Sequence, residues 1–145
     1  MLTPLSTLLG EKGSNIFSVA PNTTVADCVR KMNTERIGAL LVVDEDKPVG
    51  IFTERDVMTR VLDAERDPKA TLVSEVMSPD LACVNPDATV GDAMRVISEK
   101  RFRHLPVVEG GKVVGVVSIG DLTRWLVRNQ EEEIQHLVNY IAGNY

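Results

Sequence analysis

The sequence contains few of the residues on which most catalytic and metal centres depend. It has two histidines and two cysteines among 145 residues. Neither cysteine has a suggestive histidine neighbour, and two histidines do not assemble a metal cluster. Cys28 and Cys83 fall in different parts of the chain, which argues against a disulfide framework and indicates a reducing compartment. We therefore expect a protein that is not an enzyme and holds no metal.

Other absences narrow the class further. No stretch approaches the roughly 20 apolar residues of a membrane span, and the N-terminal residues lack the basic start of a secretion signal. The absence of a Gly-x-Gly-x-x-Gly turn excludes a Rossmann-type dinucleotide site. The net charge of −5 argues against a broad nucleic-acid interface, which needs clustered positive charge. We expect a cytoplasmic protein without nucleic-acid or membrane partners.

What the chain does contain is an internal repeat. Residues 17–62 and 82–127 align without a gap at an offset of 65, and fourteen aligned pairs are identical. A unit of about 45 residues buries too little surface to fold alone. The two copies are therefore expected to share an interface around a pseudo-twofold axis.

Each repeat has the order β-α-β-β-α. A short extended piece ends at a proline, and Thr24 or Thr89 then caps a helix, with Asp27 or Asp92 three residues later. Apolar residues follow at the spacing of an amphipathic helix. Apolar runs separated by a polar turn then predict a hairpin, over 40–43 and 49–52 in the first repeat and 105–108 and 113–117 in the second.

We expect an α+β protein in which two βαββα repeats pack sheet to sheet, with short flanking helices. The expected parts are an N-terminal helical segment, a first repeat, a connection, a second repeat and a C-terminal helix, over residues 1–13, 14–66, 67–78, 79–128 and 129–145. The connection includes a short helix over 73–77. Apolar residues in both flanking segments predict that they pack on the module or on a second copy of it.

The last helix of each repeat begins with groups suited to a nucleotide. Asp56 and Asp121 can each accept hydrogen bonds from the two adjacent hydroxyls of a ribose. Thr53 and Ser118 can donate a hydroxyl to a phosphate beside the free N–H groups of a helix N-terminus. The same Thr/Ser-x-x-Asp spacing is also that of a plain capping box, so a purely structural role stays open.

The repeats resemble the paired cystathionine-β-synthase (CBS) domains of a Bateman module. The resemblance rests on Gly-x-x-[Thr/Ser]-x-x-Asp at 50–56 and 115–121 and on Arg-His-Leu-Pro-Val-Val at 103–108. It covers about residues 14–128 and is particularly close to short stand-alone bacterial proteins that contain little besides the pair. It implies a regulatory module that binds adenine nucleotides in clefts between the repeats, with AMP expected first and ATP, ADP, NAD or S-adenosylmethionine as alternatives.

The resemblance also implies which residues face the ligands and that the two clefts differ. Arg103 and His104 would face the nucleotide held by Thr53 and Asp56, whereas Ser118 and its cleft would face residues 38–39, which carry no charge. Adjacent strand residues point to opposite faces, so Arg103 and His104 can both reach a phosphate only if the backbone turns there. The predicted ligand-binding residues are Ile51, Thr53, Arg55, Asp56, Arg103, His104, Val116, Ser118 and Asp121.

We expect a homodimer that senses an AMP-type ligand and modulates a separate partner protein. One alternative is an NAD(H)-binding sensor of redox state, in which the AMP half of the dinucleotide fills the same cleft. Another is an interaction scaffold with no ligand, in which Thr53 and Asp56 serve only as helix caps.

Overall fold

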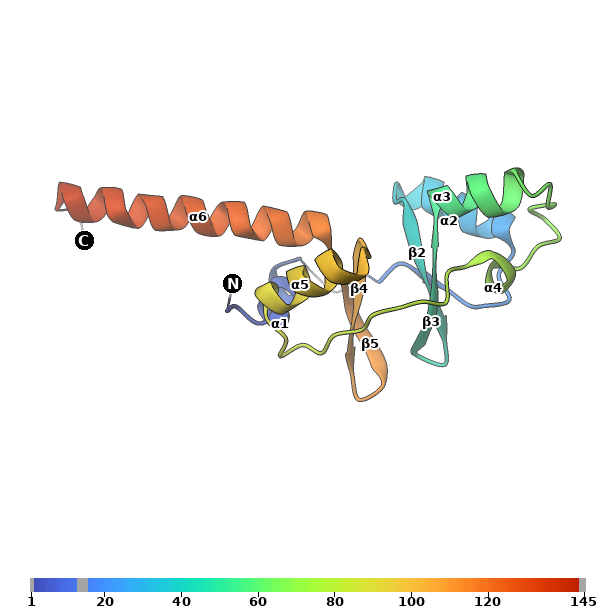
Figure 1. Ribbon diagram of the computed structural model, residues 1–145, viewed down its shortest axis with the longest axis horizontal. Helices are drawn as coiled ribbons and strands as arrows, with labels where there is room; N and C mark the ends of the chain where they lie inside the picture. The colour runs from blue at the N-terminus through green and yellow to red at the C-terminus, as the bar shows by residue number, and fades with distance from the viewer. Residues whose placement is uncertain (1, 13–15, 144–145) are drawn as a thin grey trace.

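The computed structural model describes residues 2–12 and 16–143. Two α+β units lie side by side with their hairpins adjacent, and a long C-terminal helix extends away from the second unit (Figure 1). This is the predicted pair of repeats. The expected boundary between residues 13 and 14 lies outside the described residues.

The first repeat follows the predicted order of elements. It consists of β1 (Ser18–Val19), α2 (Val25–Glu35), β2 (Ala39–Asp44), β3 (Lys47–Thr53), α3 (Glu54–Asp56) and η1 (Val57–Leu62). β1 pairs in parallel with β2, which pairs antiparallel with β3. The predicted last helix is interrupted in its winding: three α-helical residues lead into the π-helical η1, where the Asp63 N–H donates to the Met58 carbonyl oxygen at 3.0 Å.

The second repeat has the same order with two differences. It consists of α5 (Val90–Lys100), β4 (His104–Glu109), β5 (Lys112–Ser118) and α6 (Ile119–Ala142). Its first extended piece is a single parallel bridge between Val84 and Val107. α6 continues without a break through the expected boundary at 128–129, because the residues around that boundary include good helix formers and neither glycine nor proline.

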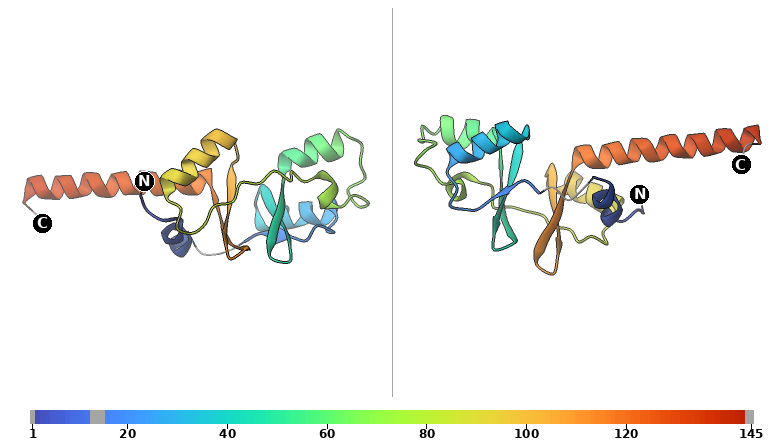
Figure 2. Two further views of the ribbon diagram at one scale, coloured as in Figure 1. Left: turned by 60° about the horizontal axis from the view of Figure 1, so that its bottom comes forward. Right: turned by 180° about the vertical axis from the view of Figure 1, so that it is seen from behind.

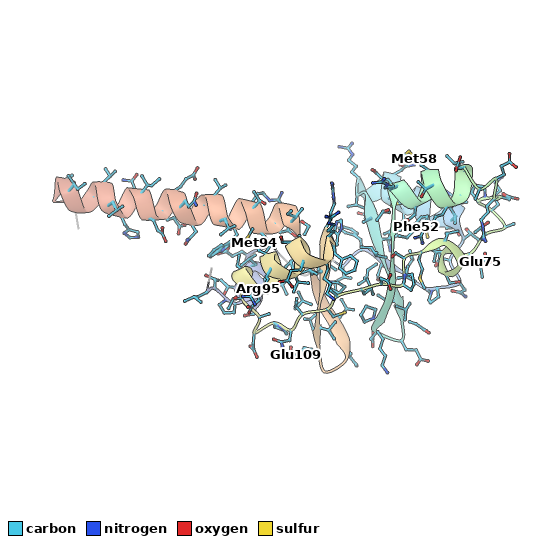
Figure 3. The ribbon with its side chains drawn as sticks, viewed as in Figure 1. Phe52, Met58, Glu75, Met94, Arg95 and Glu109 are labelled. Carbon is cyan, nitrogen blue, oxygen red and sulfur yellow. The ribbon has the colours of Figure 1, made fainter. Side chains whose placement is uncertain are left out.

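Each repeat completes its core with the segment that precedes the other repeat. α1 (Leu5–Lys12) buries Leu5 and Leu8 in the core of the second repeat. α4 (Val73–Val76) buries Val73 and Val76 in the core of the first, around Phe52 of β3 (Figure 3). The predicted helices are present, and their exchange ties the two repeats together.

Two glycines of the repeat permit this exchange. A Cβ atom at Gly50 would lie 3.0 Å from the carbonyl oxygen of Ser78, and one at Gly115 would lie 2.6 Å from Cδ2 of Leu9. At Gly50 a larger residue would press on the backbone of the crossing segment, whereas at Gly115 it would displace the end of the Leu9 side chain.

The two sheets meet through β3 and β5, whose hairpins lie side by side in both views of Figure 2. At the hairpin ends, the Val113 N–H donates to the Asp46 carbonyl oxygen at 3.1 Å, and Lys112 Nζ lies 3.7 Å from Asp46 Oδ2. The meeting of the sheets positions the clefts between the repeats. In the described ranges, none of the helices combines the length and apolar character needed to cross a membrane.

Candidate functional site

Two cavities lie where the repeats meet, and we call them cleft A and cleft B. Cleft A has a volume of about 520 Å³ and is lined by Gly38, Ile51, Thr53, Glu54, Arg55, Asp80, Leu81, Arg101, Phe102, Arg103 and His104. Cleft B has a volume of about 380 Å³ and is lined by Phe17, Ile37, Gly38, Ala39, Leu40, Leu41, Ile51, His104, Pro106, Val116, Ser118 and Asp121. Both volumes fall within the range of small-molecule sites, roughly 300–1,000 Å³.

The two clefts are built by the same rule. Each combines the Thr/Ser motif of one repeat with the segment that enters the first hairpin strand of the other. Thr53 thus lies opposite residues 101–104, and Ser118 lies opposite residues 37–41, which is the pairing implied by the resemblance. Gly38, Ile51 and His104 line both clefts, so the two cavities are neighbours.

The backbone turns between α5 and β4, as it must if the side chains of Arg103 and His104 are to reach the same cleft. α5 ends at Lys100, and its C-cap residue Arg101 has a left-handed φ of 58° and donates its N–H to the Ile97 carbonyl oxygen at 2.8 Å. His104 is the first residue of β4, whereas Arg103 precedes the strand. Because Arg103 lies outside the regular strand, strand alternation does not separate the two side chains, and both line cleft A.

Cleft A gathers three arginines that form no ion pair within the described residues. Arg55, Arg101 and Arg103 line it, together with the carboxylates of Glu54 and Asp80. All three arginines are exposed. Within residues 2–12 and 16–143, none of their guanidinium groups forms a hydrogen bond or an ion pair. Cleft A is therefore poised for an anionic group.

Thr53 and Asp56 form a complete capping box at the start of α3. The Thr53 N–H donates to Asp56 Oδ2 at 2.9 Å, and the Asp56 N–H donates to Thr53 Oγ1 at 3.3 Å. Asp56 Oδ1 lies 3.7 Å from Arg60 Nε. Thr53 lines cleft A, and its hydroxyl, which accepts the Asp56 N–H, can donate a hydrogen bond to a ligand. Asp56 is not among the described residues that line this cleft.

Ser118 and Asp121 repeat the capping arrangement in cleft B. The Ser118 N–H donates to Asp121 Oδ2 at 2.9 Å, and the Asp121 N–H donates to Ser118 Oγ at 3.1 Å. Asp121 lines the cleft, and its Oδ1 accepts a hydrogen bond from Arg124 at 2.6 Å. Among the described residues, the lining of cleft B includes no arginine or lysine. Cleft B is thus the more apolar and the less positive of the two.

Thr24 and Thr89 cap the first helix of each repeat, as the sequence predicts. Thr24 Oγ1 accepts the Asp27 N–H at 3.2 Å, and Thr89 forms a full capping box with Asp92. The Thr89 backbone N–H donates to Asp92 and holds the pKa of that carboxyl below its usual value. In the described part of the chain, His, Cys, Asp and Glu side chains form no group of three or more that could hold a metal ion.

Several lining residues are absent from the predicted set. Asp80 and Phe17 belong to the segments that cross between the repeats, and the sequence pattern does not reveal that exchange. Glu54 and Arg101 could have been found from their neighbours, because Glu54 adjoins Thr53 and Arg101 lies two residues before Arg103. The predicted Ile51 and Val116 line clefts A and B respectively, and Ile51 also lines cleft B.

Comparison with known proteins agrees with this architecture. A family model of the CBS domain matches residues 13–63 and 73–128. The mitochondrial CBS domain-containing protein CBSX3 of Arabidopsis thaliana is 38% identical over 127 residues, which cover 84% of this chain and 62% of CBSX3. CBS domain-containing protein YhcV of Bacillus subtilis (strain 168) is 35% identical over 109 residues, which cover 75% of this chain and 77% of YhcV. The chain thus spans slightly less than two thirds of the Arabidopsis relative.

Solved structures of related proteins share the fold. A protein with CBS domains from Burkholderia ambifaria MC40-6 superposes with a TM-score of 0.81 at 40% identity, over 88% of this chain and 96% of that one. The CBS-domain structure NE2398 superposes with a TM-score of 0.80 at 40% identity, over 86% of this chain and 98% of that one. Proteins built from such pairs are generally regulatory modules rather than enzymes. The chain belongs to the CBS-domain family, as a tandem pair of CBS domains.

Proposed function

We propose that this protein is a regulatory module that senses an adenine nucleotide of the AMP type in cleft A. The observation that carries the proposal is that most of the arginines without an ion pair line cleft A. Six of the ten arginines form ion pairs with carboxylates. Of the other four, which form no ion pair within the described residues, three line cleft A. Cationic side chains kept unneutralised around one cavity suit a ligand that brings its own negative charge.

The parts of a nucleotide have separate partners in this cleft. Arg55, Arg101 and Arg103 suit a phosphate, because guanidinium groups bind its oxygens through paired hydrogen bonds. Thr53 offers its hydroxyl to the ribose or phosphate. Ile51 and Phe102 supply apolar wall for the adenine ring.

The position of the cleft suits a sensor. Its lining comes from both repeats, so a ligand that contacts both favours one arrangement of the two over another. A partner protein can respond to that change only if the ligand has different affinities for the two arrangements. Cleft B, with Ser118 and Asp121, would take a second nucleotide with weaker contacts to its phosphate.

A dinucleotide such as NAD(H) is a second candidate. It is supported by the wall that clefts A and B share, formed by Gly38, Ile51 and His104. The AMP half would occupy cleft A and the nicotinamide half would extend toward cleft B. Such a ligand would make the protein a sensor of redox state.

Isothermal titration of the nucleotide-free protein tests the proposal. AMP, ATP, NAD, NADH and S-adenosylmethionine are titrated in parallel, with adenosine as the phosphate-free control. We expect micromolar binding of AMP and much weaker binding of adenosine. Tight binding of NAD or NADH without AMP binding would favour the redox sensor. Silence from all the ligands, with the fold verified by circular dichroism, would favour the scaffold and overturn the proposal.

A further inference from the structure

The chain crosses from the first repeat to the second directly after α4, passing β3 on the way (Figure 1). We call residues 77–81 the crossing segment. Ser78 and Ile51 of β3 are joined by two hydrogen bonds, in which each N–H donates to the other's carbonyl oxygen at 2.9 Å. Asp80 and Leu81 then line cleft A, as Ile51 does. One wall of cleft A is therefore an irregular segment, and its position depends on the contacts that hold it.

A single arginine holds the start of the crossing segment. Arg60 of η1 donates from Nη1 to the carbonyl oxygens of Val76 at 3.3 Å and of Met77 at 3.0 Å. Carbonyl groups at the C-terminal end of a helix lack a partner within the helix. The guanidinium group supplies that partner, and it thereby fixes both the end of α4 and the first residue of the crossing segment.

The same guanidinium group reaches the capping box of α3. Arg60 Nε lies 3.7 Å from Asp56 Oδ1, and the Asp56 side chain is only 13% exposed. With its other oxygen, Oδ2, Asp56 accepts the Thr53 N–H at 2.9 Å. Thr53 lines cleft A. Arg60 thus connects two walls of the cleft, one at Thr53 and the other at the crossing segment.

We propose that Arg60 is a positioning residue for cleft A, and that its bridge between Asp56 and the crossing segment holds both walls in the arrangement that binds a ligand. This inference rests on the proposed function of the cleft. Arg60 is not among the described residues that line cleft A, so it acts through the groups it holds. The bridge needs several donors fixed in one plane, which a guanidinium group has and a lysine ammonium group lacks. Walls that are ordered in advance favour binding, because the ligand does not have to order them.

The second repeat has no arginine at the equivalent position. Trp125 lies where the offset of 65 places Arg60, and it packs against the core of the second repeat. Its indole ring has one N–H donor and no positive charge. The end of α1, which takes the place of α4 in the second repeat, is joined to α6 by the ion pair between Arg128 and Glu11 at 2.7 Å. Loss of Arg60 should therefore affect cleft A more than cleft B.

Hydrogen exchange of the nucleotide-free protein tests the bridge itself. Arg60→Met should speed the exchange of the Ser78 amide and its neighbours roughly tenfold, because the crossing segment loses an anchor. Arg66→Met is the matched control. Arg66 Nη1 lies 3.8 Å from Glu75 Oε2, so this ion pair also holds α4, but it involves neither Asp56 nor the crossing segment. The control should exchange as the wild type does, and wild-type exchange in Arg60→Met would overturn the bridge.

Isothermal titration tests the effect of the bridge on binding. Arg60→Met should lower the affinities for AMP and for adenosine by the same factor, roughly tenfold, because the two walls contact the nucleoside as well as the phosphate. Arg60→Lys should bind almost as weakly as Arg60→Met, since an ammonium group does not span both sets of acceptors. Arg66→Met should bind as the wild type does. Arg60 is about half exposed, so the variants should fold, and circular dichroism checks that they do.

The results separate positioning from simple attraction of charge. Arg60→Met might be expected to weaken AMP alone if its charge acted on the phosphate; adenosine affinity would then stay unchanged, Arg60→Lys would restore AMP binding, and the bridge would be overturned. Unchanged affinity for both ligands would overturn it as well. Failure of the wild type to bind any nucleotide would instead overturn the proposed function, and hydrogen exchange would still decide whether Arg60 holds the crossing segment.

Discussion

Arg103 and Gly38 hold equivalent positions in the two repeats, and their carbonyl oxygens accept equivalent hydrogen bonds. The Ile119 N–H donates to Arg103 and the Glu54 N–H donates to Gly38, both at 3.0 Å. Each bond fixes the segment that enters the first hairpin strand against the last helix of its own repeat. The backbone therefore makes the same hydrogen bond at both positions, and the Arg103 side chain is one of the differences between clefts A and B.

Removing the Arg103 side chain should weaken phosphate binding in cleft A. A hydrogen bond to a charged group contributes about 1.5–3 kcal/mol, so Arg103→Ala should lower AMP affinity by about 10- to 100-fold. Adenosine affinity should change little. Arg95→Ala is the matched control, because Arg95 lies exposed on α5 outside both clefts (Figure 3). Isothermal titration measures all three effects, and unchanged AMP affinity in Arg103→Ala would remove Arg103 from the site.

Adding the side chain at the equivalent position should strengthen cleft B. A Cβ atom at Gly38 would meet only the flexible end of Glu54, at 3.3 Å, and Gly38 does not have a positive φ. Gly38→Arg should therefore fold and raise AMP affinity at the second site about tenfold or more. The titration should resolve two binding events. A single event identical to that of the wild type would contradict the equivalence of the two clefts.

Asp56 should matter for both stability and binding. Asp56→Ala removes the acceptor of the Thr53 N–H and should cost about 1 kcal/mol of unfolding free energy. It should also lower nucleotide affinity, because the Asp56 carboxylate accepts the Thr53 N–H and so holds Thr53 in place in the lining of cleft A. Asp92→Ala breaks the matching capping box of α5. That control should lower the thermal midpoint without changing nucleotide affinity. Wild-type affinity in Asp56→Ala would show that Asp56 is only a cap.

Gly50 should tolerate no side chain. Gly50→Ala forces a methyl group against the carbonyl oxygen of Ser78 and should destabilise the fold by about 1–3 kcal/mol. Gly10→Ala is the control, because Gly10 lies inside α1 with nothing within 4 Å of the added atom. That variant should gain about 0.5–1 kcal/mol from helix propensity. Urea denaturation measures both, and equal stability of Gly50→Ala and wild type would contradict the close approach of the crossing segment.

The two cysteines should differ in reactivity. Cys28 is buried in the core of the first repeat, where burial and then the nearby Asp27 raise its pKa to about 11. At pH 8, such a pKa leaves roughly one thiol in a thousand ionised. A thiol reagent should therefore modify one cysteine, the exposed Cys83, in the native protein and both after unfolding. Rapid modification of native Cys83→Ser would contradict the burial of Cys28.

The raised pKa of Cys28 also predicts a pH dependence of stability. The folded state keeps a proton that the unfolded state releases above the ordinary thiol pKa of 9.0. The contribution of this group is therefore complete below pH 9 and decreases as the pH rises from 9 toward 11. Unfolding free energies measured across that range should fall with pH.

Local structure could be predicted from the sequence because its signals are local. Thr24, Thr89 and Thr53 mark their helix starts correctly, and the polar turns mark the hairpins. The exchange of α1 and α4 could not be predicted, since it depends on which core has room for an apolar helix. The π-helical winding of residues 57–62 gives no comparable signal in the sequence.

The candidate site could be predicted in part for the same reason. The resemblance predicts that Thr53, Arg55, Arg103 and His104 face one ligand, and all four line cleft A. Asp56 belongs to the capping box of α3 and does not line cleft A. This position could not be predicted, because a capping box and a ribose-binding motif share one spacing. Asp80 enters the cleft only through the crossing segment.

A crystal structure of the protein with AMP would test the central claim most directly. The proposed function predicts AMP in cleft A, with its phosphate beside Arg103 and Arg55 and its adenine against Ile51. Nucleotide bound outside both clefts, or clefts left empty at a saturating AMP concentration, would contradict it.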